Sequence, residues 1–238
     1  TNAWCMYDWG SSAFSTTVEA AVLPVYFEQI ASAVLKSNLI TAYWGYANSI
    51  SLFLAALLSP ILGSIADYTG SKKKLLGLFA ALGIVATALL VTITTGDWIP
   101  ALVLFIIGSL SLGASYIFYD ALLGHITDPE ERDYISSKGY ALGYLGGGIL
   151  LAINIAMIWF LEVDNWGVRL SFLSVAIWWA IFTLPLLKRV PEPPANTTDL
   201  QPGMSPVKAG FDRLLKTFSE LSKYRELFKF LVAFWLYN

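Results

Sequence analysis

Six long apolar runs constrain this chain more than any other feature of its sequence. A helix rises about 1.5 Å per residue, so some 20 apolar residues cross a hydrocarbon core of about 30 Å. We therefore expect an all-α membrane protein in which each run forms a transmembrane helix. The predicted spans run from Trp4 to Ile30, Ile40 to Ala66, Leu75 to Thr95, Trp98 to Leu123, Tyr140 to Leu161 and Gly167 to Leu187, and a seventh begins near Leu227.

The composition supports a membrane environment. Charged residues make up 13% of the chain and hydrophobic residues 56%, whereas a soluble domain holds about 25% charged residues. The net charge of -2 gives no basis for nucleic-acid binding. Cys5 is the single cysteine, so no disulfide can form within the chain.

The basic residues predict the orientation of the chain in the bilayer. All Lys and Arg residues except Lys36 and Arg169 fall in loops on one side of the predicted spans. Because loops that carry Lys and Arg stay in the cytoplasm, we expect the N-terminus to be cytoplasmic. The seventh span then leads outward.

A proline-rich linker, residues 188–226, separates two predicted parts of the chain. Its first part is expected to be extended or disordered. Its second part predicts an amphipathic helix, which lies on the cytoplasmic membrane surface or simply connects the two parts in solvent. The apolar positions of this predicted helix are Phe211, Leu214, Leu215, Phe218 and Leu221.

Beyond the linker the sequence begins to repeat itself. Residues 234–238 show the order of aromatic, apolar, Tyr and Asx residues found in residues 3–8. Transporters built from two parallel halves produce such repeats. We therefore expect residues 1–187 to form the N-terminal six-helix bundle of a twelve-helix protein, residues 227–238 to start helix 7, and a C-terminal six-helix half to be the partner of this bundle.

A short basic loop joins the second and third spans. Its sequence, Gly63-Ser-Ile-Ala-Asp67-Tyr-Thr-Gly70-Ser-Lys72-Lys-Lys74, resembles the loop between the second and third helices of the major facilitator superfamily. The resemblance implies a gating loop, in which Asp67 caps a helix of the other half or pairs with a cytoplasmic Arg. The gating residues are expected to be Gly63, Asp67, Gly70, Lys72, Lys73, Lys74 and Arg132.

Two further motifs resemble the vacuolar amino-acid effluxer branch of this superfamily. The first is Trp4-x-x-Tyr7-Asp8-Trp-x-x-Ser12-Ala-Phe followed by Pro-x-Tyr26-Phe. The second is Pro-Glu-Glu-Arg132 followed by Gly139-Tyr-Ala-Leu-Gly143-Tyr-Leu-Gly-Gly-Gly148. The resemblance implies a permease that moves a small solute, an amino acid in yeast relatives, by alternating access. It implies the bacterial inner membrane, or the vacuolar membrane in a eukaryote.

A polar stripe on the first span predicts a solute or proton path. Its members are spaced by four, three, four and seven positions, which places them on one face of an α-helix. Burying a charged glutamate in lipid costs a few kcal/mol, and protonating an ordinary glutamate at pH 7 costs roughly 3.7 kcal/mol. The central glutamate is therefore the candidate proton carrier. Alternatively, it pairs with a cation in the other half or holds a structural water. The stripe consists of Asp8, Ser12, Ser15, Glu19 and Tyr26.

Other polar residues in the spans are weaker candidates. Tyr116, Tyr119 and Asp120 are expected to oppose Asp8 across a cavity, although Tyr near a membrane boundary also serves as an interfacial anchor. Buried amides either contact solute or form hydrogen bonds between helices. The two amide candidates are Asn48 and Asn154.

Glycines at positions 139, 143 and 147 predict close helix packing, because they recur every four residues. We expect no cofactor and no metal site, since His125 is the only histidine, and neither an HExxH sequence nor a phosphate-binding loop occurs. The sequence therefore favours a transporter over an enzyme. A membrane sensor or scaffold that keeps the fold without transport is the alternative.

Overall fold

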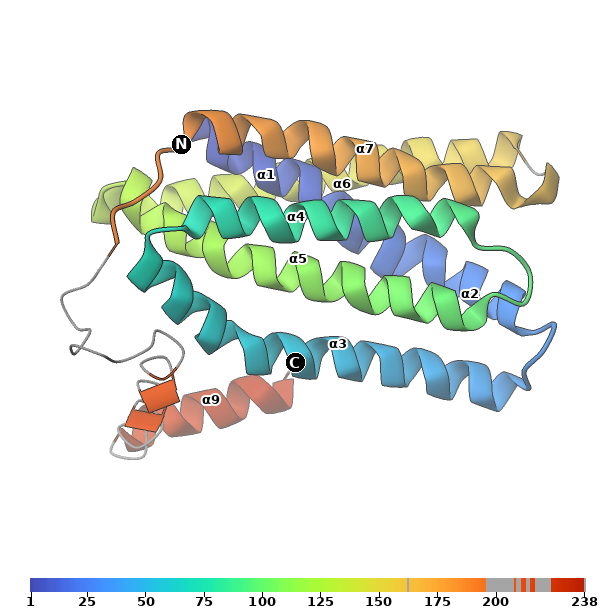
Figure 1. The fold of residues 1–238 in the computed structure, drawn as a ribbon, viewed down its shortest axis with the longest axis horizontal. Helices are drawn as coiled ribbons and strands as arrows, with labels where there is room; N and C mark the ends of the chain where they lie inside the picture. The colour runs from blue at the N-terminus through green and yellow to red at the C-terminus, as the bar shows by residue number, and fades with distance from the viewer. Residues whose placement is uncertain (162, 196–207, 209–210, 213–214, 217–223, 238) are drawn as a thin grey trace.

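The described part of the computed structural model, residues 1–161, 163–195, 208, 211–212, 215–216 and 224–237, is helical and contains no strand, which confirms the all-α prediction. Short 3₁₀ turns connect several of the long helices shown in Figure 1. The elements are α1 (Asn2–Ala13), η1 (Phe14–Val22), α2 (Leu23–Ala31), α3 (Ser37–Thr69), α4 (Lys72–Leu89), η2 (Leu90–Thr92), α5 (Trp98–Ile126), η3 (Pro129–Glu131), α6 (Arg132–Phe160), η4 (Val163–Asn165), α7 (Trp166–Arg189) and α9 (Arg225–Tyr237).

Five helices among the described residues are long and apolar enough to cross a membrane, namely α3 to α7. The first predicted span corresponds to the consecutive elements α1, η1 and α2. Several helices continue past the predicted spans, and α6 begins at Arg132 rather than at Tyr140. Hydropathy marks only the part of a helix within the hydrocarbon, so it misses polar turns that extend into water. Most of the predicted linker helix lies outside the described residues.

The middle of the first span is a π-helix, η1. Pro24 lies two residues beyond its last residue, Val22, and a proline inside an α-helix clashes with the carbonyl four residues earlier and donates no hydrogen bond. The wider winding of η1 avoids that arrangement. A π-helix turns less per residue than an α-helix, so the predicted alignment of all five polar residues on one face does not extend to Tyr26.

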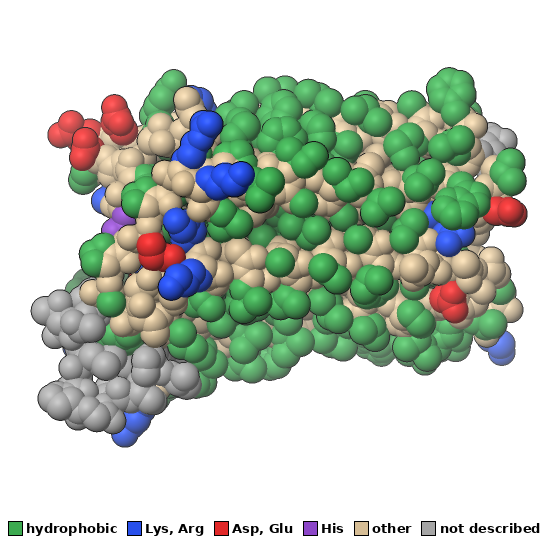
Figure 2. Space-filling model, turned by 45° about the horizontal axis from the view of Figure 1, so that its top comes forward, with side chains coloured by type: hydrophobic (Ala, Val, Ile, Leu, Met, Phe, Trp, Pro, Cys, Tyr) green, Lys and Arg blue, Asp and Glu red, His purple; other side chains and the backbone are tan. Residues whose placement is uncertain are grey.

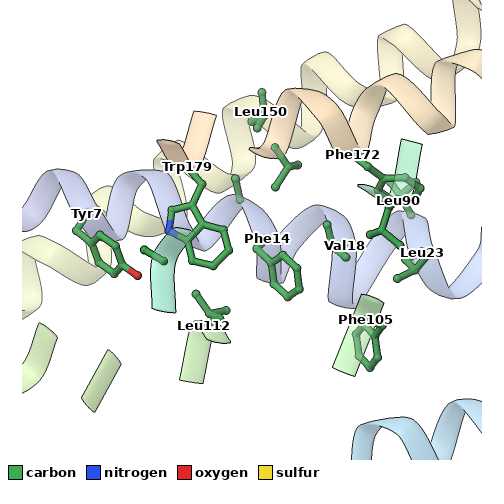
Figure 3. Close-up of a cluster of buried hydrophobic side chains, with 14 of the residues drawn as sticks. Tyr7, Phe14, Val18, Leu23, Leu90, Phe105, Leu112, Leu150, Phe172 and Trp179 are labelled. Carbon is green, nitrogen blue, oxygen red and sulfur yellow. The ribbon is translucent and has the colours of Figure 1, made fainter. Parts of the chain in front are cut away.

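The helices pack in a pattern that places the first span inside the bundle. Helix α1 packs against α6 and α7, while α4 packs against α5 and α7, and α3 lies outside them against α5 (Figure 1). Phe14 and Trp179 meet in the core with ring centroids 5.8 Å apart (Figure 3). Glycines make room for these rings, because a Cβ at Gly83 would lie 2.5 Å from Trp179 and one at Gly108 would lie 2.8 Å from Phe14.

A glycine face of α6 receives α1. A Cβ at Gly139 would lie 2.9 Å from the Trp4 ring, and one at Gly143 would lie 2.6 Å from Ser12 Oγ. Beside Gly147, the closest atom to such a Cβ is Thr16 Cγ2 at 2.9 Å. The two backbones approach closely because these positions carry no side chain.

The surface of the bundle has an apolar middle and charged ends. Figure 2 shows hydrophobic side chains over the long sides, with Lys and Arg side chains gathered mainly at one end. At the opposite end of α4, the hydroxyl and the backbone N–H of Thr94 donate to Asp97 Oδ2 over 2.6 and 3.0 Å. These bonds lower the pKa of Asp97 below its ordinary value. The distribution fits a multi-pass membrane protein.

The orientation remains a prediction that labelling can check. Lys74 and Thr95 are exposed at opposite ends of α4. In a Cys5→Ala background, an impermeant thiol reagent should label Thr95→Cys but not Lys74→Cys in intact cells, because Lys-rich loops remain in the cytoplasm. Both variants should label after the cells are permeabilised. Labelling of position 74 alone in intact cells would reverse the orientation.

Candidate solute pathway

A cavity of about 390 Å³, with a mostly apolar surface that includes several polar groups, lies between η1, α3 and α5. Its lining combines hydroxyl, amide and carboxyl groups, and holds no Lys or Arg among the described residues. A larger cavity of about 570 Å³, lined by Ile155, Trp159 and Val168 among others, carries no charged side chain. The smaller one contains polar groups of the kind that fix the orientation of a polar solute. Its polar lining residues are Ser15, Glu19, Asn48, Ser51, Ser109 and Tyr116.

Glu19 projects from η1 into this cavity and is half-buried. Ser109 Oγ on α5 donates a hydrogen bond of 2.6 Å to Glu19 Oε1. This bond stabilises the charged carboxylate, because an ionised acceptor forms a stronger hydrogen bond than a neutral one. The carboxyl group thus has one fixed oxygen contact and faces a space that a solute or water can enter.

Asp8, a residue of α1, is buried beside α5, and 3% of its surface is exposed. Its Oδ1 accepts hydrogen bonds from Ser12 Oγ at 2.9 Å and from Tyr116 OH at 2.8 Å. Ser11 Oγ lies 3.1 Å from the same tyrosine hydroxyl. Tyr116 also lines the cavity of Glu19, so one side chain connects the two acidic residues.

Tyr119 lies beside this network, with its ring centroid 5.5 Å from that of Tyr116, but among the described residues neither Tyr119 nor Asp120 forms a hydrogen bond to Asp8. The Tyr119 ring stacks on Trp4 with centroids 4.0 Å apart, and its buried hydroxyl has no hydrogen-bond partner among the described residues. The Asp120 side chain is exposed. Of the three residues expected to oppose Asp8, Tyr116 is the one that donates a hydrogen bond to the buried carboxylate. Solute contact by these residues stays a prediction.

Tyr26 and Asn154 are also placed away from the cavity. Tyr26 OH donates to the carbonyl of Ile93 at 2.7 Å, which ties α2 to the turn after η2. Asn154 Nδ2 lies 3.3 Å from Thr17 Oγ1, and its Oδ1 accepts from Ser174 Oγ at 2.6 Å. Of the two roles considered for Asn154, the structure thus supports the hydrogen bond between helices.

Ser109 is a polar cavity residue that the sequence interpretation missed. A serine in an apolar run carries little signal alone, because it hydrogen-bonds readily to its own helix. Its position gives the available clue, since Ser109 precedes Tyr116 by seven residues and thus lies on the same face of α5.

The basic loop forms a local ion pair rather than the expected contact with Arg132. Asp67 Oδ1 lies 2.8 Å from Lys72 Nζ, which also lies 3.0 Å from His125 Nε2. Arg132 donates to the carbonyl of Gly124 at 3.3 Å. The lysine is the nearer partner because α4 begins at Lys72, five residues after Asp67.

The two loop glycines have different roles. Gly70 ends α3 with a left-handed φ of 59°, a conformation that glycine adopts without strain. A Cβ at Gly63 would meet only Ile117 Cγ2, at an ordinary 3.8 Å. No other helix among the described residues therefore approaches Gly63 closely.

Comparisons with known proteins decide the family. A family profile described as "Vacuole effluxer Atg22 like" matches residues 34–132 and 124–238. The chain belongs to this Atg22-like family. An uncharacterized MFS-type transporter, YxiO of Bacillus subtilis, is 36% identical over 99% of this chain and 56% of its own length. Autophagy-related protein 22 of Pyricularia oryzae is 26% identical over 63% of this chain and 30% of its own length.

The fold of this Atg22-like chain is that of a major facilitator protein. The proton:xylose symporter XylE superposes with a TM-score of 0.59 at 17% identity, covering 80% of this chain and 43% of XylE. The chain thus spans about half the length of YxiO and less than half the length of the other two proteins. The expected family and the half-length facilitator fold are thereby confirmed.

The Asp67–Lys72 pair of the Atg22-like chain provides a test of the gating loop. Asp67→Asn removes the charge but keeps the size, so Lys72 loses its ion pair. We expect a shift in the balance between inward-open and outward-open states, measured by thiol labelling of Asn48→Cys in the cavity. Glu130→Gln, which alters an exposed acid in η3, serves as the control. Unchanged labelling and unchanged transport would mean that the ion pair has no gating role and that the loop only contributes to helix packing.

Proposed function

We propose that this chain is the N-terminal half of a secondary transporter that moves a small solute across a membrane by alternating access. The cavity between η1, α3 and α5 forms part of the solute path, and Glu19 carries a coupling proton. The observation that supports this most directly is the position of Glu19. Its carboxyl group faces the cavity from the middle of the first span, and its described hydrogen-bond partner is a neutral serine.

The surroundings of Glu19 suit a reversible proton site. A charged carboxylate within a membrane costs a few kcal/mol unless water or a partner compensates for the lost hydration. Ser109 supplies part of that compensation, and the open cavity admits water for the remainder. When the cavity closes and dries, the water is withdrawn and its part of the compensation is lost. Alternating wet and dry states would therefore load and release a proton.

An amino acid is the solute that we favour. The family to which the chain belongs is described as vacuole effluxer-like, and the resemblance in the first span and α6 is to the amino-acid effluxer branch. Chemically, the amide oxygen of Asn48 and the hydroxyl oxygens of Ser15 and Ser51 can accept hydrogen bonds from a solute ammonium group. The cavity lining offers no cation for a solute carboxylate, so we expect the C-terminal half to bind that end.

Counterflow in liposomes tests the proposal. Liposomes that contain the intact protein and a mixture of unlabelled amino acids should take up labelled amino acid faster than protein-free liposomes. Tyr116→Phe should slow this exchange by about tenfold or more, because it removes a hydrogen bond to a charged group. Tyr140→Phe, which alters an exposed tyrosine of α6, should leave it unchanged.

The same experiment separates transport from the alternative of a sensor or scaffold. Exchange of no amino acid, with the protein folded and inserted, would exclude the proposed solute class. Extension of the counterflow panel to sugars, organic acids and amines would then decide whether the chain transports at all.

A further inference from the structure

The segment that follows α7 lies against the basic loop between α3 and α4. We call residues Val190–Ala195 the linker strap. Glu192 Oε1 accepts a hydrogen bond from the backbone N–H of Lys73 at 2.7 Å, and its Oε2 accepts from that of Lys74 at 3.3 Å. In the reverse direction, Lys73 Nζ donates to the carbonyl of Val190 at 2.9 Å. Three hydrogen bonds therefore join two segments almost 120 residues apart.

The first turn of α4 requires a partner of this kind. The N-cap residue Ser71 makes no side-chain capping bond, so the N–H groups of the first turn lack acceptors within the helix. The first three residues of α4 are lysines, and positive charge is unfavourable at the positive end of a helix dipole. Asp67 neutralises Lys72. Glu192 supplies the acceptor and the negative charge for the next two residues.

The strap also touches the loop through its backbone. A Cβ at Gly70 would lie 2.7 Å from the nitrogen of Ala195 and 3.2 Å from the oxygen of Pro193. Val190 and Pro193 are buried. Two sets of contacts therefore hold the strap against the loop. They are the close backbone contact at Gly70 and the hydrogen bonds of the Glu192 carboxylate to the first turn of α4.

We propose that Glu192 is a positioning residue that docks the linker strap onto the gating loop, so that a pull on the chain beyond residue 195 reaches the Asp67–Lys72 pair. The connection is short, because the residues that bind Glu192 directly follow the lysine that binds Asp67. This role is separate from the proposed transport chemistry and does not depend on the solute. It assigns a mechanical task to the start of a segment whose composition predicts only an extended linker.

Spin labelling can test the docking without knowledge of the solute. In the intact protein with Cys5→Ala, a nitroxide at Ala195→Cys reports the motion of the strap, since Ala195 is exposed and adjoins Gly70. Glu192→Ala should convert an immobilised spectrum into a mobile one and reduce the docked-to-undocked ratio by about tenfold or more. Glu192→Gln keeps one acceptor oxygen and should give an intermediate spectrum. Glu226→Ala, which removes an exposed acid of α9, should change nothing.

A second readout separates docking from simple helix capping. If the strap transmits motion, Glu192→Gln should also change the accessibility of Asn48→Cys in the cavity, whereas a capping role alone would lower thermal stability and leave both labels unaltered. An immobilised label in both Glu192 variants would overturn the proposal. Because neither readout requires transport, failure of the amino-acid exchange would leave this result standing.

Discussion

Replacing Glu19 with Gln is expected to abolish solute accumulation driven by a pH gradient, yet to preserve exchange between two loaded compartments. Glutamine resembles the protonated carboxyl group in size but neither gains nor releases a proton. Exchange requires binding and alternating access without net proton movement, so it should survive the substitution. Accumulation requires a proton to cross with each solute, so it should fall to the level of protein-free liposomes.

The measurement compares both activities in the same liposome preparation. Glu28→Gln, which alters an exposed glutamate of α2, is the matched control and should retain both. Loss of accumulation and exchange together would assign Glu19 to solute binding or to structure instead. Accumulation at the wild-type rate would exclude it as the proton carrier.

The largest effect on stability is expected at Gly146. A Cβ at this position would lie 2.4 Å from the carbonyl oxygen of Trp9 and 2.8 Å from the Trp9 ring. The obstacle includes backbone, so α1 must move away from α6 to admit a methyl group. That carbonyl also accepts a hydrogen bond of 3.2 Å from Trp178 Nε1, which the movement would strain. Overpacking of this kind costs about 1–3 kcal/mol.

Gly148 provides the matched control on the same helix. A Cβ at Gly148 would meet nothing within 4 Å, so Gly148→Ala should leave stability unchanged or raise it slightly through helix propensity. In detergent, Gly146→Ala should lower the melting temperature by several degrees, at about 2–4 °C per kcal/mol for a chain of this size. Equal melting temperatures for the two variants would show that α1 and α6 are not closely packed there.

Much of the fold was predictable because a bilayer imposes strong rules. Any apolar run of sufficient length must form a helix that satisfies its own backbone, so the six runs indicated six spans. The π-helix was not predictable in this way. It depends on how Pro24 is accommodated in a packed helix, and its consequence is local, since Tyr26 turns to Ile93 while Glu19 faces the cavity.

The site was predictable where charge in an apolar setting gave a signal. Glu19 and Asp8 stand out because buried acids are costly, and the structure gives each of them hydrogen-bond donors. Ser109 and Glu192 gave no such signal. The serine is common in membrane helices, and the glutamate lies in a proline-rich stretch and binds backbone amides far away in the sequence. Contacts of that type depend on tertiary packing and leave no pattern along the chain.

The hydroxyl of Tyr116 can donate one hydrogen bond, and in this structure Asp8 accepts that bond. A solute group in the cavity that accepted the same proton would leave Asp8 with only the Ser12 donor. Solute and buried carboxylate would thus compete for one hydrogen atom. The free energy of filling the cavity would then be linked to how firmly α1 is held against α5, without any direct contact between the solute and Asp8.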